Sequence, residues 1–408
     1  MSVASPVKQR INSLDLLRGI AVLCILVMNI PVFSSINATV QNPTAYGDFT
    51  GLNKWIWIVN HIFFDQKFMA LFSTLFGAGI LLMSQSNKAK GIDEKSIHFR
   101  RMKWLALFGL VHAYILWEGD ILFSYALIGM VMFFLRNKPA KKLFWIGTII
   151  FIIPIFLNVL NGLALMFVDV PKEEIADQLK WWAPSAEDIS ADINGYRGGW
   201  LDQMPFRAEV AFFLESLALL FYTFWRSGGL MLIGMALMKW DVLTGKREKS
   251  FYTKLAIVGF GIGITINVVG LLFNFKHEFS FEIAGTFGAM FNYIAGYFTL
   301  FGIIGLILRI SKSDILTRAK DLLQNLGRMA FTNYIMQSVI CTFLFYGHGF
   351  GLYGSVERTE QMIIVGLIWI FQIYFSNFWL KHYAFGPLEW GWRCLTYKTK
   401  QSIKRTDV

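Results

Sequence analysis

The chain has 408 residues, of which 55% are hydrophobic and 16% are aromatic, and its mean hydropathy is +0.49. A soluble domain is less apolar than this, so the composition excludes an ordinary soluble fold. The alternating pattern of a membrane β-barrel is also missing from the sequence. Repeated apolar runs of about 20 residues instead predict an all-α integral membrane protein.

Ten membrane-spanning helices are expected, in a single polytopic membrane domain that comprises residues 1–408. The sixth apolar run is long and interrupted, so this span is expected to tilt, kink or begin outside the membrane. The expected spans, in chain order, lie near residues 14–36, 57–84, 103–118, 120–136, 143–168, 210–238, 252–274, 283–308, 328–347 and 361–380.

The net charge is +11, and its distribution along the chain predicts the orientation in the membrane. Most Lys and Arg residues lie in every second connecting segment. These basic segments are 1–18, 85–103, 136–142, 239–254, 309–328 and 381–408. The positive-inside rule then places both termini in the cytoplasm. Because topology accounts for the positive charge, no nucleic-acid partner is expected.

The longest segment on the opposite side is an extracytoplasmic loop, residues 169–206. It is acidic, and its start, PKEEIADQLKWW, predicts a short amphipathic helix at the outer surface. Loops of this length often have a function.

Polar residues of the first span form the first candidate site. Asp15 and Arg18 are three residues apart and share a helical face near the cytoplasmic end. They either form an interfacial ion pair or leave Arg18 facing an anionic cytosolic ligand, such as a phosphate. Asn29 is eleven residues beyond Arg18, on nearly the same face. It either bonds to another helix or lines a cavity.

The stretch NHIFFDQKFMALFSTLFGAG, residues 60–79, leads into the second span and contains three ionisable residues. His61 and Asp65 are four residues apart, so in a helix the carboxylate orients the imidazole ring and raises its basicity. Lys67 falls on another face. The alternative is that all three are hydrated residues at the membrane interface.

The turn between the third and fourth spans contains His112, Glu118 and Asp120. A single histidine in an apolar span is often a bonded structural residue. Together with His61 and Asp65, however, these residues predict one acidic, imidazole-lined cavity at the outer ends of spans two to four.

The sixth span contributes Glu215 and Arg226, which are eleven residues apart and therefore expected on one face. A cation this deep needs a partner, and the two residues form either a structural ion pair or a substrate contact. The cysteines at 24, 341 and 394 have no metal-ligand spacing, so no metal is expected.

The start of the chain resembles a known enzyme family. SLDLLRG at residues 13–19, with Asn29 further on, resembles the start of heparan-α-glucosaminide N-acetyltransferase and of the wider superfamily of transmembrane acyltransferases. His61, which follows Asn60, looks like the active-site histidine of that superfamily. Residues 1–136 are therefore described as acyltransferase-like.

Four longer blocks are similar to the YeiB family of bacterial polytopic membrane proteins. They are KFMALFSTLFGAG, GLVHAYILWEGDILFSYALIG, LGRMAFTNYIMQSVICTFLFYGHGFGLYG and FGPLEWGWR. This resemblance extends over nearly the whole chain, with residues 210–397 as the YeiB-type helical region. It implies a multi-pass protein of the bacterial plasma (inner) membrane, in contact with membrane lipids, and it allows a homodimer.

The resemblance implies an acyltransferase that moves an acyl group from a cytosolic acyl-CoA or acetyl-CoA to an extracytoplasmic or lipid-borne acceptor. The acceptor would be a small molecule, a glycan or a lipid. Arg18, supported by Asp15, would contact the CoA phosphates, and Asn29 would hold the thioester carbonyl. His61 would be the general base and Asp65 would orient it.

The alternative function is a transporter or lipid-handling membrane protein without acyl transfer. Lys67, Glu215 and Arg226 would then line a substrate path through the membrane. A third alternative is an inactive scaffold or sensor with the same fold.

Overall fold

The computed structural model describes residues 11–167 and 171–405, and these residues form helices and connecting loops with no β-strand among them. In chain order the elements are α1 (Asn12–Ser34), α2 (Ala38–Gln41), α3 (Gly51–Phe63), α4 (Lys67–Ala89), α5 (Glu94–Val111), η1 (His112–Leu116), α6 (Leu122–Met132), η2 (Phe133–Leu135), α7 (Ala140–Phe167), α8 (Lys172–Trp182), α9 (Ala186–Arg197), α10 (Met204–Glu215), η3 (Leu219–Thr223), α11 (Phe224–Lys239), α12 (Lys249–Lys276), α13 (Phe281–Ile283), η4 (Ala284–Gly288), α14 (Ala289–Ser311), α15 (Thr317–Arg328), α16 (Ala330–Phe345), α17 (Arg358–His382) and α18 (Pro387–Tyr397).

Within the described residues, seven helical stretches are long and apolar enough to cross a membrane. Two shorter apolar helices, Leu122–Leu135 and Ala330–Phe345, accompany them. The seven stretches are Asn12–Ser34, Gly51–Ala89, Ala140–Phe167, Met204–Lys239, Lys249–Lys276, Phe281–Ser311 and Arg358–His382. The all-α membrane architecture is thereby confirmed, while the count of ten spans stays a prediction.

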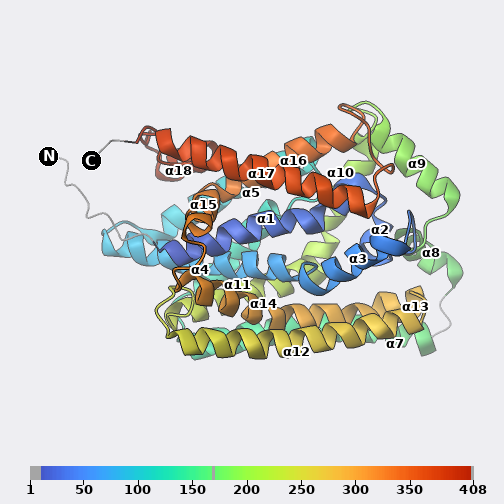
Figure 1. The fold of residues 1–408 in the computed structure, drawn as a ribbon, viewed down its shortest axis with the longest axis horizontal. Coiled ribbons are helices and arrows are strands. Elements are labelled where there is room, and N and C mark those ends of the chain that lie inside the picture. Colours follow the sequence, from blue (N-terminus) through green and yellow to red (C-terminus); the bar gives the residue numbers. More distant parts are fainter. Residues whose placement is uncertain (1–10, 168–170, 406–408) are drawn as a thin grey trace.

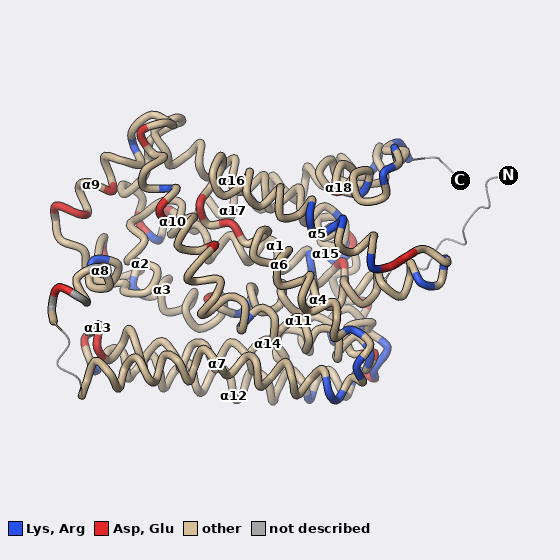
Figure 2. Tube along the Cα trace, turned by 180° about the vertical axis from the view of Figure 1, so that it is seen from behind, with Lys and Arg blue, Asp and Glu red and all other residues tan. Residues whose placement is uncertain are grey.

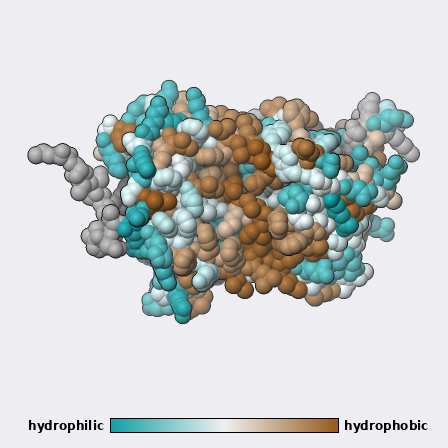
Figure 3. Space-filling model, turned by 90° about the horizontal axis from the view of Figure 1, so that it is seen from above, coloured by the Kyte–Doolittle hydropathy of each residue, from teal (hydrophilic) through white to brown (hydrophobic). Residues whose placement is uncertain are grey.

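The long helices run roughly along one direction and form an elongated bundle (Figure 1). α7, α12 and α14 lie along one side of the bundle, and α16 and α17 lie along the opposite side. α1, α4 and α11 fill the space between them, and every residue of α11 from Arg226 to Met238 is buried. A hydrophobic band crosses the middle of the surface between two hydrophilic ends, as expected for a protein surrounded by lipid (Figure 3).

Charge distinguishes the two ends of the bundle (Figure 2). Lys and Arg gather where α4 ends, α5 begins and α15 and α18 lie. Asp and Glu gather around α8, α9 and α13 at the other end. We call these the basic end and the acidic end. The expected amphipathic helix in the loop 169–206 is present as α8, at the acidic end.

The core depends on a close approach of α4 to α11, which glycines permit. A Cβ on Gly77 would lie 2.0 Å from the carbonyl oxygen of Met231, and a Cβ on Gly234 would lie 1.9 Å from that of Thr74. These two crossing points bring the backbones into contact, as small residues do in other membrane helix pairs.

The Gly77→Ala variant is expected to lower the free energy of unfolding by about 1–3 kcal/mol, because the two backbones must separate. Gly261→Ala is the matched control, since a Cβ there meets nothing within 4 Å. This second variant should be neutral, or more stable by up to about 1 kcal/mol through helix propensity. Thermal unfolding of both proteins in detergent measures the difference, and equal stability of the two would contradict the proposed contact.

Candidate active site

A cavity of about 230 Å³ is lined by residues of α1, α3 and α17 and of the segments beside them, and we call it the outer cavity. It exists because the second apolar stretch breaks between α3 and α4. The amides of Phe64 and Asp65 both donate to the carbonyl of Asn60, and Gln66 then takes a left-handed conformation with φ +68°. A residue other than glycine rarely adopts this conformation, and such strain often accompanies function. The expected span 57–84 therefore contains a break and consists of parts of two helices, α3 and α4.

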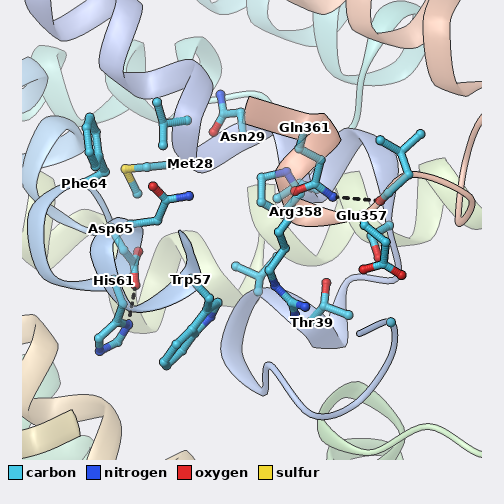
Figure 4. Close-up of a pocket in the computed structure, with 18 of the residues that line it drawn as sticks. Met28, Asn29, Thr39, Trp57, His61, Phe64, Asp65, Glu357, Arg358 and Gln361 are labelled. Atoms are coloured by element: carbon cyan, nitrogen blue, oxygen red, sulfur yellow. Dashed lines mark hydrogen bonds and ion pairs between the residues drawn. The ribbon is translucent and has the colours of Figure 1, made fainter. Parts of the chain in front are cut away.

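This break brings His61 and Asp65 to the cavity wall. Nδ1 of His61 lies 3.5 Å from Oδ2 of Asp65, and the imidazole ring stacks on Trp57 with 4.8 Å between ring centroids. Figure 4 shows both residues beside Trp57, with Asn29 on the neighbouring α1. Among the described residues, Nε2 of His61 has no hydrogen-bond partner. This nitrogen is therefore not engaged within the described part of the chain.

Asn292 of α14 forms a hydrogen bond with the Asp65 carboxylate. Its Nδ2 donates to Oδ2 of Asp65 at 2.6 Å, while its Oδ1 accepts from Nδ2 of Asn267 at 3.1 Å and from the ammonium of Lys67. Because an ammonium only donates, this contact fixes which side of the Asn292 amide faces Asp65. The amide therefore presents a donor to the carboxylate that orients His61.

Lys67 does not line the outer cavity, and it is not the hydrated interface residue that one of the two alternatives expected. Its side chain is fully buried, and its ammonium donates to the carbonyl of His61 at 2.7 Å and to Asn292. The physical reason is the break in the stretch, which turns α4 so that its first residue points into the bundle. Lys67 thus braces the backbone of His61.

Arg226 is also buried, and it does not pair with Glu215 as expected. Its guanidinium donates to the carbonyl of Gln66 at 2.7 Å, so it supports the strained break directly. The expectation assumed one continuous α-helix. The structure instead ends α10 at Glu215 and inserts the π-helical turn η3 before α11, which changes the register. Glu215 is turned toward Tyr114, and neither Glu215 nor Arg226 lines the two cavities described here.

A second cavity, of about 710 Å³, extends inward from the basic end, and we call it the inner cavity. Arg18 lines it and is paired with Asp15, with 3.3 Å between Nη1 and Oδ1. Further cations line the same cavity, namely Lys90, Arg101, Arg328 and Arg393. The wall beyond them is mostly apolar and follows α4 from Met83 to Met69.

The two cavities meet inside the bundle. Asn29 of α1 and Met69 of α4 line both of them. At this place the partition is therefore a single layer of side chains. Asn29 is the one member of the predicted site that faces both sides.

The expectation of one outer cavity for His61, Asp65, His112, Glu118 and Asp120 is corrected, because only the first two lie there. Asp120 lines the inner cavity, and its Oδ1 lies 2.8 Å from Nδ1 of His112. The other ring nitrogen of His112 lies 2.8 Å from the Ser338 hydroxyl, so this histidine is a buried, bonded residue.

Glu118 lies in a separate buried cluster, 3.4 Å from Nε of Arg207. It also accepts hydrogen bonds from the hydroxyls of Tyr196 at 2.8 Å and Tyr346 at 3.1 Å. The η1 turn explains why it departs from Asp120, since the chain after it is extended at Trp117 and the two acids point to different helices.

Sequence reasoning missed Asn292, Arg207 and the cations at 101, 328 and 393. Asn292 lies in the apolar run GAMFNYIAGY, so the argument applied to Asn29 would have found it. Arg207 precedes the expected sixth span and lies in the apolar stretch Met204–Lys239, so the argument applied to Arg226 would have found it. The other three were assigned to the basic side, but no local pattern places them around one cavity.

Comparison with known proteins identifies the relatives of this architecture. A family model described as "Protein of unknown function (DUF418)" matches residues 237–399, which include Arg328 and Arg393 of the inner cavity. A protein of Escherichia coli (strain K12) described as "Uncharacterized protein YeiB" is 31% identical over 401 residues, which cover 96% of this chain and 97% of that protein. The chain belongs to the YeiB family. Another YeiB-family relative, "Uncharacterized protein YxaH" of Bacillus subtilis (strain 168), is 30% identical over 426 residues, covering 98% of each chain.

Proposed function

We propose that this protein is a membrane-bound acyltransferase that moves an acyl group from a cytosolic acyl-CoA to an extracytoplasmic or lipid-borne acceptor. The observation that carries the proposal is the meeting of the two cavities at Asn29 and Met69. One cavity holds a histidine paired with a carboxylate, and the other has a cationic mouth. With the basic end in the cytoplasm of the inner membrane, as the positive-inside rule predicts, the donor and the acceptor reach the partition from opposite sides.

In this mechanism Nε2 of His61 takes the proton of the acceptor hydroxyl or amine. The acceptor atom attacks the thioester carbonyl carbon beside Asn29, whose amide donates to the carbonyl oxygen. The carbon–sulfur bond then breaks, and the CoA thiolate leaves and recovers the proton from His61. Asp65, held by Asn292, stabilises the imidazolium between these two transfers.

The donor side of the proposal is tested by direct binding. Arg18→Ala is expected to weaken acetyl-CoA binding about tenfold or more, because a hydrogen bond to a charged group contributes about 1.5–3 kcal/mol. Calorimetric titration of purified protein in nanodiscs measures the affinity. Arg309→Ala is the control, since Arg309 also lies near the basic end but does not line the inner cavity. Absence of acetyl-CoA binding to the folded wild type would refute the proposed function.

The same pair of cavities favours a second candidate, a transporter that opens them in turn. That reading requires solute movement without a thioester. Uptake by proteoliposomes in the absence of any acyl-CoA would support it, whereas thioester binding together with release of free thiol supports acyl transfer.

A further inference from the structure

The C-terminal helix α18 forms part of the inner cavity, although it lies beyond the last apolar stretch. It contains most of the block FGPLEWGWR, to which the mechanism above gives no role. Its cavity-lining residues are Glu389, Trp392, Arg393, Thr396 and Tyr397. These side chains can therefore contact part of a donor molecule in the cavity.

Trp392 positions a cation from another helix. The guanidinium of Arg101 lies over the Trp392 ring, 3.9 Å from its centre, and Nε1 of Trp392 donates to the carbonyl of Arg101 at 3.0 Å. Both ends of Arg101 are thus fixed by one tryptophan. An aromatic face holds a cation in place without neutralising its charge.

Arg393 is supported in the same way, between the rings of Phe385 at 5.1 Å and Tyr397 at 5.3 Å. Among the described residues neither Arg393 nor Arg101 forms an ion pair with a carboxylate. The charge of Arg101 is instead repelled by those of Arg18 and Arg393, which lie nearby. A polyanion bound among the three would relieve this repulsion.

Glu389, the only acidic residue of α18, is engaged elsewhere. Its carboxylate accepts from the amides of Phe331 at 2.7 Å and Thr332 at 3.0 Å, and from the Thr332 hydroxyl at 2.5 Å. It therefore caps the start of α16. Because these hydrogen bonds hold Glu389 against α16, its carboxylate forms no ion pair with Arg393 of the same helix.

The cations at the mouth of the inner cavity are far from Asn29 and Met69 at its inner end. The cavity follows α4 from Met83 to Met69, which is about 21 Å at the rise of an α-helix. A ligand whose reactive carbonyl reaches Met69 must therefore keep its charged part near the basic end. Acyl-CoA has this shape, since the pantetheine arm separates the thioester from three phosphates.

We propose that α18 determines the specificity of the donor site. Its Arg393, together with Arg101 of α5, which Trp392 holds in place, binds the 3′-phosphate of the adenosine end of CoA. This inference rests on the proposed function, because it assigns the phosphate end of the same donor. It predicts selection of CoA thioesters over thioesters that lack this phosphate.

The test is a titration of the full chain in phosphatidylcholine nanodiscs with CoA and with dephospho-CoA, which lacks only the 3′-phosphate. Wild type is expected to bind CoA about 10- to 100-fold more tightly than dephospho-CoA. Arg393→Ala is expected to lose most of this preference while retaining the dephospho-CoA affinity. Arg247→Ala is the matched control, because Arg247 is an exposed arginine over the Phe251 ring that does not line the cavity.

Equal binding of the two ligands by wild type, or an unchanged preference in Arg393→Ala, would overturn the inference and leave the proposed function standing. If folded wild-type protein binds neither CoA, dephospho-CoA nor acetyl-CoA, the inference and the proposed function are both refuted. Repeating the titration in phosphatidylglycerol nanodiscs shows whether these arginines bind lipid phosphate instead of the phosphate of CoA. Loss of CoA binding in anionic lipid, combined with no preference in phosphatidylcholine, would assign these arginines to lipid headgroups and overturn the inference.

Discussion

Turnover by a His61→Ala variant is expected to fall by about 10²- to 10⁴-fold, with acetyl-CoA affinity remaining at the wild-type level. The two effects separate because His61 lines the outer cavity and the cations that would bind the donor line the inner one. Thiol release from acetyl-CoA, with a cell extract as the source of acceptors, measures turnover. Titration of the same preparation measures affinity.

His277→Ala is the control for this experiment. His277 directly follows α12 toward the acidic end, and it lines neither cavity. Its removal is expected to leave turnover and binding unchanged. Wild-type turnover by His61→Ala would eliminate the general-base role, whereas a joint loss of binding and melting temperature would show that His61 is needed for the fold instead.

An Arg207→Ala variant is expected to lose about 3–5 kcal/mol of unfolding free energy. Arg207 and Glu118 are both fully buried, and removal of the guanidinium leaves the Glu118 carboxylate buried with only tyrosine hydroxyls as partners. The cluster joins α9, α10, the turn before α6 and the end of α16. Loss of the cation should therefore loosen the whole acidic end, and thermal unfolding in detergent measures it.

Two further variants show whether burial is the cause. Lys180→Ala removes an exposed ion pair with Asp188, 3.2 Å apart, and is expected to cost at most about 1 kcal/mol. Replacing Glu118 with glutamine in the Arg207→Ala background should restore part of the stability, because no unpaired charge then remains. A melting temperature of Arg207→Ala equal to that of Lys180→Ala would show that the buried pair contributes little.

Contacts between residues close in sequence were predictable. The pairs Asp15–Arg18 and His61–Asp65 are three and four positions apart, and both are present. Residues three or four positions apart lie about one helical turn apart on the same face, so both contacts can be predicted without knowledge of the tertiary structure. The roles of these residues remain predictions.

Two features defeated prediction from the sequence. The contact of Asn292 with Asp65 joins positions 227 residues apart, and only the packing of α14 against α4 brings them together. The assumed alignment of Glu215 with Arg226 failed because the π-helical turn η3 interrupts the helix between them. Periodicity identifies helices well, but one extra residue in a π-helical turn rotates the faces of the following helix relative to those of the preceding one.

The single layer of side chains at Asn29 and Met69 has a cost for the cell. An energised membrane is discharged by any continuous water path, and here open space reaches this layer from both sides. In the proposed acyl transfer, the same two residues would let an acyl group pass and would still act as the proton seal of the membrane. A large, flexible thioether such as that of Met69 suits both duties, because it fills irregular space and moves aside without leaving a polar gap.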